Sequence, residues 1–405
     1  MSLTDSIGVY PEREAERASW ILARRGARNP LDPFKPRVFL VEEERAESGE
    51  IVSVATIFLT NRECPWRCLM CDLWKSTLTE TVPIGAIPAQ IDHALAQLVD
   101  ADVSSQHVSG ESSRVLTNAA TRQIKIYNSG SFFDPRAIPP GDYAPIAERV
   151  RAFERVVVEC HPTLVGESAL KFRDLLKTAD NSAARPPVHR PTPGSSREGN
   201  SAIAHAAALP SFGGVGGGFV IARAALNIAA HSAGAGQKLE VAMGLETAHP
   251  QVMEKLNKRM TLDQFRRAAE FLRENEIALR VFVLVKPPFL DEAEALHWAK
   301  RSVDFAFDCG ATAVSLIPTR LGNGALEALE ARGEFSPPKL ATLEAALDYG
   351  IGLKRARVFA DLWDLEKFSD CEGCFERRRA RLRAMNLRQI NLPQLTCECC
   401  QARTT

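Results

Sequence analysis

Continuously apolar runs recur along the chain and predict buried parallel strands, because a strand covered on both faces has no polar side to alternate with. The runs that fit are Ile51–Thr60, Ile124–Tyr127, Arg155–Glu159, Leu239–Met243, Ala278–Val285 and Val314–Ile317, with Arg355–Leu365 as a further candidate. Helical spacing occupies the intervals at 88–99, 251–259 and 262–272. This alternation predicts an α/β fold built as a parallel barrel.

Four segments do not fit the barrel pattern. Residues 11–28 predict an N-terminal helix, and the charged stretch 42–50 predicts a loop before the first strand. Residues 104–121 are polar and without period, and residues 177–237 are rich in proline, alanine and glycine, so both predict insertions. The predicted organisation is an N-terminal helical extension (1–50), a core (51–360) with an insertion at 177–237, and a C-terminal extension (361–405).

Net charge and the distribution of cysteines limit the binding partners and the cellular location to be expected. The 405 residues carry 50 Lys and Arg against 50 Asp and Glu, so net charge does not indicate nucleic-acid or membrane binding. The N-terminus lacks the regions of a signal peptide, and no apolar run approaches the roughly 20 residues of a membrane helix, so a cytoplasmic location is expected. Eight of the ten cysteines gather at 64–71 and 371–400, which in a reducing compartment indicates metal sites.

The first cysteine group is the strongest chemical signal in the sequence. Cys64, Cys68 and Cys71 have the spacing C-x3-C-x2-C and directly follow the first apolar run. Three thiolates in so short a loop suit an iron-sulfur cluster or zinc. If the group is a four-iron cluster, one iron has no cysteine ligand and is open to another molecule. A structural zinc site with a remote fourth ligand is the alternative.

This loop resembles the signature loop of the radical S-adenosylmethionine (SAM) superfamily. The resemblance implies a 4Fe-4S cluster on the three cysteines, with the open iron chelating SAM, and a partial parallel (β/α)6 barrel of the TIM-like kind. It also implies reductive cleavage of SAM to a deoxyadenosyl radical that abstracts hydrogen from a substrate. The residue before the last cysteine is usually aromatic and packs on the adenine; here it is Met70, whose soft apolar side chain suits the same contact.

The resemblance assigns further SAM contacts to strand ends. The loop Ser129–Gly130–Ser131 stands where such proteins hold the SAM amino group, and Glu159 stands where they bind the ribose. Gly244–Thr247 followed by Leu256–Arg259 is similar to the fourth strand and helix of the MiaB, NifB and elongator-acetyltransferase-like branch, and Glu246 would contact SAM. An ordinary turn is the alternative for the serine loop and would be preferred without the cysteine loop, and a salt bridge to Lys255 or Arg259 is the alternative for Glu246.

Other polar residues at strand ends have structural explanations as well. Cys160 and His161 look like metal ligands in isolation, but packing plus a hydrogen-bonded histidine is the commoner meaning of such a pair. Lys286, Thr319 and Arg320 would suit a substrate phosphate or carboxylate if they face the barrel mouth. Simple surface positions would explain these three nearly as well.

The C-terminal extension predicts a second metal site. The spacing of its five cysteines fits either a zinc ion or an auxiliary iron-sulfur cluster. Either group needs four ligands, so one cysteine is spare. The five are Cys371, Cys374, Cys397, Cys399 and Cys400. Residues 376–388 between them carry six arginines, which predicts either contact with RNA phosphates or a solvated charged helix.

Taken together, the motifs predict a radical SAM enzyme, in the branch that resembles the archaeosine-forming proteins acting on a tRNA base. Its expected partners are a flavodoxin- or ferredoxin-like reductant and tRNA, without a membrane. The alternatives are an iron-sulfur protein that binds RNA or senses redox state without radical chemistry, and a methylthiotransferase-like enzyme with a functional auxiliary cluster.

Overall fold

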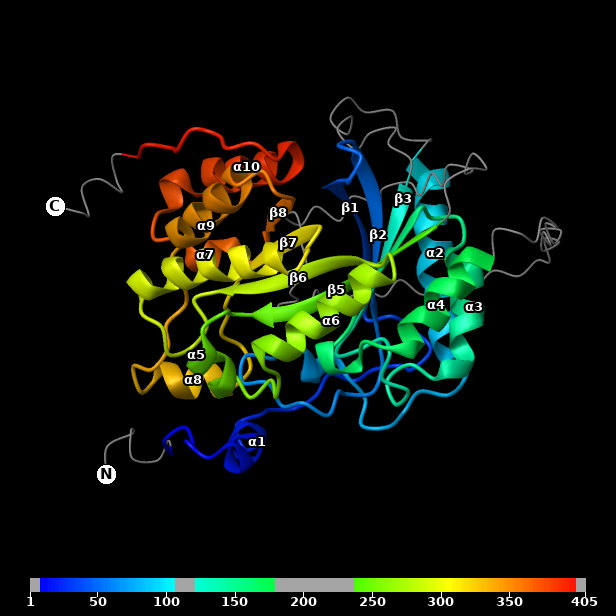
Figure 1. Ribbon diagram of the computed structural model, residues 1–405, viewed down its shortest axis with the longest axis horizontal. Coiled ribbons are helices and arrows are strands. Elements are labelled where there is room, and N and C mark those ends of the chain that lie inside the picture. Colours follow the sequence, from blue (N-terminus) through cyan, green and yellow to red (C-terminus); the bar gives the residue numbers. More distant parts are fainter. Residues whose placement is uncertain (1–7, 106–120, 179–236, 398–405) are drawn as a thin grey trace, which may run out of the picture.

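The computed structural model describes residues 8–105, 121–178 and 237–397, in which the strands form one eight-stranded sheet in the order β1 to β8 (Figure 1). β1 pairs antiparallel with β2, and each later pair is parallel. The strands are β1 Val38–Arg45, β2 Ile51–Leu59, β3 Thr121–Asn128, β4 Arg155–Glu159, β5 Lys238–Glu246, β6 Ala278–Val285, β7 Ala313–Pro318 and β8 Arg357–Ala360.

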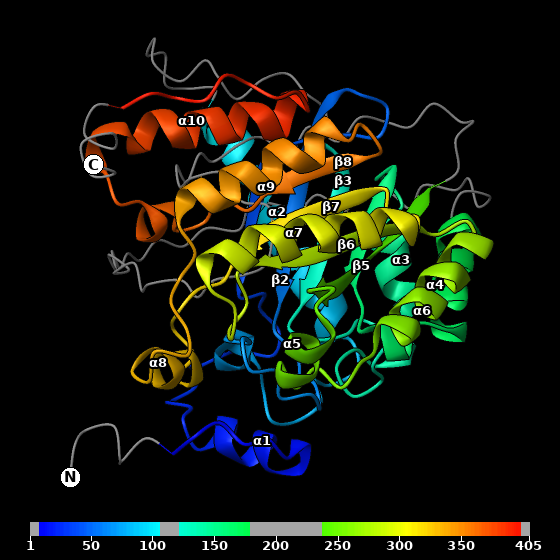
Figure 2. The same ribbon diagram turned by 60° about the vertical axis from the view of Figure 1, so that its left-hand side comes forward.

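Helices cover the outer face of this sheet, and the N-terminal helix lies across one end of the strands (Figures 1 and 2). Capping boxes fix the starts of two of them, Thr261 with Gln264 at α6 and Asp291 with Glu294 at α7. The helices are α1 Glu14–Leu22, α2 Ala86–Ser105, α3 Tyr143–Val150, α4 Glu167–Thr178, α5 Pro250–Lys255, α6 Leu262–Glu274, α7 Glu292–Asp308, α8 Ala325–Glu330, α9 Leu340–Gly352 and α10 Glu372–Arg388. Among the described helices, none has both the length and the apolar character needed to cross a bilayer.

The sheet curls until its two edge strands approach each other. The Arg357 guanidinium on β8 donates to the Arg45 carbonyl on β1 at 3.2 Å, although these strands are first and last in the sheet order. Helix α10 packs on both β1 and β8 and lies over the seam between them. The fold is therefore an open, partial barrel whose gap is covered by a helix.

Side-chain amides of α10 replace a missing strand at the β8 edge. The Asn386 amide accepts from the Ala360 backbone N–H and donates to its carbonyl, each at 2.8 Å. Gln389, just after the helix, makes the same pair of bonds to Val358 at 2.8 Å. On the other side of the seam, Arg383 forms an ion pair with Glu43 of β1 at 3.2 Å. An exposed edge would otherwise leave these backbone groups without partners.

A buried network of charges fills the barrel interior at the amino ends of the parallel strands. Arg280 on β6 contacts Glu44 of β1 at 2.5 Å and Glu240 of β5 at 2.7 Å. Lys125 on β3 contacts Glu44 at 2.6 Å, and Arg155 on β4 contacts Glu240 at 2.9 Å. Above this layer the interior is apolar and aromatic, with Phe58, Tyr127, Val157, Ala242, Phe282 and Ile317 in one cluster.

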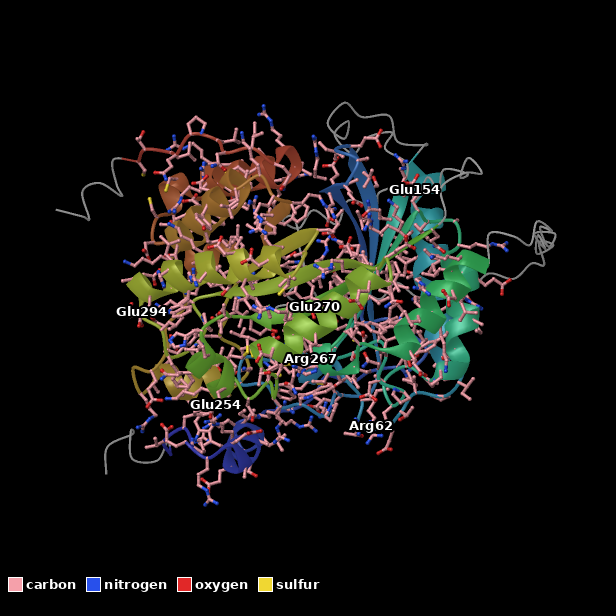
Figure 3. All side chains as sticks on the ribbon, viewed as in Figure 1. Arg62, Glu154, Glu254, Arg267, Glu270 and Glu294 are labelled. Atoms are coloured by element: carbon pink, nitrogen blue, oxygen red, sulfur yellow. The ribbon has the colours of Figure 1, made fainter. Side chains whose placement is uncertain are left out.

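The carboxyl ends of the strands lie on the opposite side, where barrels of this kind place their sites. In Figure 3, Arg62 after β2 and Glu254 after β5 lie on one side of the molecule, and Glu154, which precedes β4, lies on the other. Helix α1 and the segment before it cover the side with the carboxyl ends. Two hydrogen bonds hold them there: Tyr10 donates to the Lys255 carbonyl at 2.6 Å, and Arg17 donates to the Glu254 carbonyl at 2.8 Å.

The predicted fold class is confirmed, and each predicted strand is present, with Arg355–Leu365 shortened to β8. The prediction of a loop over 42–50 is wrong, because Val38–Arg45 is a strand. Its glutamates resemble a loop in the sequence, yet Glu44 faces the interior and meets Arg280 and Lys125 there. The predicted insertions at 104–121 and 177–237 lie almost entirely outside the described residues.

Candidate functional site

The three-cysteine loop leaves the carboxyl end of β2 and is pinned by segments far away in the sequence. The Leu69 backbone N–H donates to the Leu256 carbonyl at 2.9 Å. The Asn257 amide donates to the Arg67 carbonyl at 2.7 Å, and the Asn323 amide donates to the Leu69 carbonyl at 2.7 Å. The path of the loop is therefore set by the residues that follow β5 and β7.

Glu63, just before the first cysteine, ties the loop to the N-terminal segment. Its carboxylate forms an ion pair with Arg25 at 2.7 Å, with Arg67 at 3.2 Å, and with Arg28. Burial alone raises the pKa of Glu63, but hydrogen bonds from Arg28 and Arg25 outweigh it and lower the pKa below its usual value. The chain around α1 is thus fastened against the cysteine loop by charge.

The three thiols of the loop influence one another. Burial raises the pKa of Cys64 to about 12 and that of Cys68 to about 11, and negative charge at Cys68 raises the pKa of Cys64 further. Burial likewise raises the pKa of Cys71, and both other cysteines add to the effect. Thiols in such a setting ionise when a metal replaces their protons.

The loop after β3 lies against the first cysteine. Gly130 has a φ of +150°, and a Cβ added to it would come within 2.8 Å of the Cys64 Cβ. Next to it, the Asn128 side-chain amide and the Ser129 hydroxyl are buried, and neither has a hydrogen-bond partner among the described residues. Ser131 differs, since its hydroxyl contacts the Cys160 sulfur at 3.4 Å. Unpaired buried polar groups are costly, so this strand end has groups free to bond a polar ligand or water.

Two carboxyl groups and a buried lysine complete this side of the site. The Asn128 backbone N–H donates to the Glu159 carboxyl at 3.1 Å, while burial raises the pKa of Glu159 to about 8. Glu246, at a φ of 66°, pairs with Lys258 at 2.5 Å. The Lys258 charge also lowers the pKa of Glu159 and of Cys68 against the larger effect of burial.

The predicted salt bridge of Glu246 to Lys255 or Arg259 is wrong, because Lys258 takes that place. Asn257 with φ 54° and Arg259 with φ 55° flank the lysine, and this unusual backbone turns the Lys258 side chain inward. The stretch Leu256–Arg259 is recognisable in the sequence as a motif. Its sequence does not show which of its cations is buried.

Cys160 and His161 are packing residues, as expected. The His161 ring stacks on Trp66 of the cysteine loop with centroids 3.8 Å apart. One ring nitrogen contacts the Lys258 carbonyl at 3.1 Å and the other contacts the Thr163 hydroxyl at 2.8 Å, so both are occupied. Sequence reasoning missed the stacking of Trp66 on His161 and the contact of Asn323 with the loop, since only folding brings these residues to their partners.

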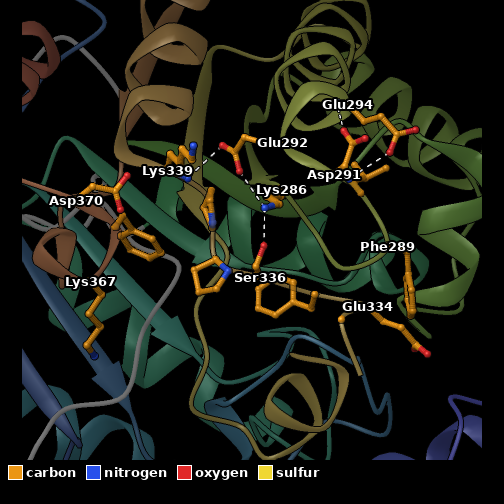
Figure 4. Close-up of a pocket in the computed structure, with 16 residues that line it drawn as sticks. Lys286, Phe289, Asp291, Glu292, Glu294, Glu334, Ser336, Lys339, Lys367 and Asp370 are labelled. Atoms are coloured by element: carbon orange, nitrogen blue, oxygen red, sulfur yellow. Dashed lines mark hydrogen bonds and ion pairs between the residues drawn. The ribbon is translucent and has the colours of Figure 1, made fainter. Parts of the chain in front are cut away.

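Met70 is partly buried and packs beside Leu69 and Phe289. Phe289 also lines a cavity of about 850 Å³, together with Phe335, Lys286 and other residues (Figure 4). Lys286 contacts Glu292 at 2.9 Å and Ser336 at 2.8 Å. Of the three polar strand-end residues proposed to face a substrate, Lys286 lines this cavity and the other two do not. Arg320 instead pairs with Asp361 at 2.8 Å, and Thr319 donates to the Val285 carbonyl.

The C-terminal cysteines form a second, separate group. The metal-ligating atoms of Cys371, Cys374 and Cys397 all lie within 4.8 Å of one another. Among the described residues, the thiols of Cys64, Cys68 and Cys71 do not meet that limit. Cys399 and Cys400, the other two predicted ligands, lie outside the described residues.

Most arginines of α10 have acidic partners within the protein. Arg378 pairs with Glu344 at 2.6 Å and Arg381 with Asp348 at 2.7 Å, both on α9. Arg383 reaches Glu43, and Arg379 reaches Glu376. The helix is held on the barrel by these pairs, which reduces the charge it presents for RNA phosphates.

No family model matches the chain. It is 21% identical over 389 residues to an uncharacterized protein of Methanocaldococcus jannaschii, covering 92% of this chain and 87% of that protein. It is 34% identical over 103 residues to archaeosine synthase subunit beta of Methanosarcina acetivorans, covering 25% of this chain and 30% of that protein.

Among solved structures, the chain is similar to TsrM of Kitasatospora setae, a radical S-adenosylmethionine methyltransferase. The TM-score is 0.36 and the identity 16%, and the match covers 69% of this chain but only 39% of TsrM. The match to archaeosine synthase subunit beta agrees with the predicted resemblance to archaeosine-forming proteins, over a quarter of this chain.

Proposed function

We propose that this protein is a radical SAM enzyme that holds a 4Fe-4S cluster on Cys64, Cys68 and Cys71. The observation that carries the proposal is that three partly buried thiols lie in one loop at the carboxyl ends of parallel strands, where Cys64 meets Gly130 beside the unpaired polar groups of Asn128 and Ser129.

The residues around the loop fit such a cofactor. Thiolates are the ligands that iron-sulfur clusters use, and Gly130 keeps open the space beside Cys64 that a side chain would fill. The unpaired amide of Asn128 and hydroxyl of Ser129 supply donors and acceptors for an amino acid head group. When bound, the cluster supplies one electron that cleaves SAM into methionine and a 5′-deoxyadenosyl radical, which takes a hydrogen atom from the substrate.

In this proposal the protein's own residues bind and orient SAM and the substrate, and they keep water out of the site. Ser129, Gly130 and Ser131 border the amino end of SAM, Glu159 and Glu246 accept from its ribose or amino group, and Met70 packs on the adenine. Lys258 balances the charge of Glu246 and of the thiolates. The cavity beside Phe289 and Phe335 would receive the substrate.

A direct test is anaerobic reconstitution with iron and sulfide, reduction with dithionite, addition of SAM, and measurement of 5′-deoxyadenosine. Formation of that product by the loaded protein supports radical chemistry. A fully loaded cluster without the product would favour the iron-sulfur binding or redox-sensing protein instead. A flavodoxin or ferredoxin is the expected reductant in the cell.

We infer further that the substrate is a modified base in tRNA. The support is the 34% identity to archaeosine synthase subunit beta, which covers a quarter of this chain. Nucleoside profiling of tRNA from a deletion strain tests it: one modified nucleoside should disappear and its precursor should accumulate. An unchanged profile would contradict a tRNA substrate without affecting the test of SAM cleavage.

Replacing Asn128 with leucine should separate SAM binding from stability. The buried amide has no partner among the described residues, so an apolar side chain of similar shape should leave the free energy of unfolding unchanged or raise it by about 1 kcal/mol. Affinity for SAM should fall roughly tenfold, because the ligand loses a hydrogen bond. Titration calorimetry and urea denaturation measure the two effects.

The matched control is Asn386→Leu. Asn386 is also a buried asparagine, but its amide is fully bonded to Ala360. This variant should lower the free energy of unfolding and leave the SAM affinity as it is. Equal effects of both variants on stability would contradict the assignment of Asn128 to a ligand.

Replacing Gly130 with alanine should impair cluster loading. The new Cβ would collide with the Cys64 Cβ, and its φ is one that L-residues rarely adopt, at a cost of about 1–3 kcal/mol. The expected result is a loss of roughly tenfold in deoxyadenosine formation, with a lower iron content per chain. Gly166→Ala is the control, since a Cβ there meets nothing within 4 Å. Full iron loading of Gly130→Ala would show that the loop does not need this close approach.

A further inference from the structure

The C-terminal cysteine group has a geometry of its own. Cys371 is the N-cap of α10, Cys374 lies in the first turn of that helix, and Cys397 belongs to the segment that follows the helix. Cys371 and Cys374 are buried and Cys397 is half-buried. Residues 26 positions apart are thereby brought together at one end of α10.

The distances select one metal ion over a cluster. The sulfurs of Cys371 and Cys397 are 3.8 Å apart, too far for a disulfide bond of about 2.05 Å. Tetrahedral zinc with Zn–S bonds of about 2.3 Å places its sulfur ligands about 3.8 Å from one another. In a four-iron cluster each cysteine binds a different iron, which separates the sulfurs further. All three ligating atoms here lie within 4.8 Å of one another.

The surroundings favour thiolates. Cys374 lies at the amino end of a 17-residue helix, where the backbone dipoles favour negative charge. The Arg378 guanidinium, one turn on, is hydrogen-bonded to the Cys374 thiol as well as to Glu344. A half-buried cation beside the sulfurs offsets the negative charge of a zinc-thiolate centre.

We propose that Cys371, Cys374 and Cys397 bind one zinc ion that fastens the segment after α10 back onto the start of the helix. Two contacts already hold this segment: Arg381 of α10 donates to the Pro393 carbonyl at 2.9 Å, and Asn391 donates to the Asp348 carbonyl of α9 at 2.9 Å. Because α10 covers the seam between β1 and β8, the zinc site holds the closure of the barrel. It is a structural site, independent of the radical SAM proposal.

Metal analysis of the full-length protein tests the site. Protein purified anaerobically should contain one zinc ion per chain, and Cys371→Ser with Cys397→Ser should reduce zinc at least tenfold while iron at the other site is kept. Cys64→Ser with Cys68→Ser should do the reverse. Cys309→Ser, a buried cysteine outside both groups, should change neither metal content.

A second measurement uses wild-type protein, in case the double variant does not fold. Cobalt taken up in place of zinc should give the intense visible bands of a tetrahedral ion with sulfur-to-metal charge transfer. An octahedral cobalt spectrum would overturn the proposal. So would iron and sulfide in place of zinc, retained when Cys64 and Cys68 are replaced, because that result identifies an auxiliary cluster.

Discussion

Cys68→Ala is expected to abolish 5′-deoxyadenosine formation, with a loss of more than about a hundredfold from the reconstituted wild-type rate. Burial raises the pKa of the Cys68 thiol to about 11, and the nearby charges of Lys258 and Glu246 also act on it. A site that lacks one of three thiolates cannot hold the cluster in its place. Product formation per chain, measured by chromatography beside iron content, gives the result.

Cys309→Ala is the control for that experiment. Cys309 is a buried cysteine at the end of α7, among the outer core residues. Its replacement should keep both iron content and SAM cleavage. Turnover retained by Cys68→Ala would reject the ligand assignment, and turnover lost by both variants would point to a general loss of folding instead.

Glu44→Ala is expected to lower the free energy of unfolding by about 3 to 5 kcal/mol, because it leaves buried cations without a partner. Glu44 contacts Arg280 at 2.5 Å and Lys125 at 2.6 Å, and all three side chains are almost fully buried. Burial alone raises the pKa of Glu44, but Arg280, Lys125 and Arg357 outweigh it and hold the pKa well below its usual range. Urea denaturation followed by circular dichroism measures the change.

The matched control is Glu50→Ala, six residues along the chain. Glu50 also forms an ion pair, with Arg122 at 2.6 Å, but it is 60% exposed. Exposed pairs contribute about 0 to 1 kcal/mol, so this variant should be near wild type. Similar losses from Glu44→Ala and Glu50→Ala would show that the interior network does not hold β1 in the sheet.

The network and the proposed active site occupy opposite ends of the barrel. Charges at the amino ends of the strands join β1, β3, β5 and β6 into one unit, whereas the cysteine loop and the unpaired end of β3 lie at the carboxyl ends. Stability and chemistry are therefore separable by mutation, which is common in barrels of this type. Glu44→Ala should accordingly alter the stability of the protein far more than its affinity for SAM.

Local patterns in the sequence determined the strands β2 to β8 and the positions of the cysteine loop, Gly130, Glu159 and Glu246, since each depends on an apolar run and the residues that directly follow it. They did not determine which charged residues are buried. Glu44 and the arginines of α10 read as solvent-exposed in the sequence, yet the structure pairs them with residues up to 340 positions away.

The same division holds within the site. Residue types and spacing determined that three thiols and two carboxyl groups gather at the strand ends. Only the tertiary structure decided that Lys258 neutralises Glu246, that Asn323 and Asn257 pin the cysteine loop, and that Cys397 returns to Cys371. The physical reason is that strands and tight loops follow from neighbouring residues, whereas the partner of a buried charge or ligand is chosen by the chain's path through space.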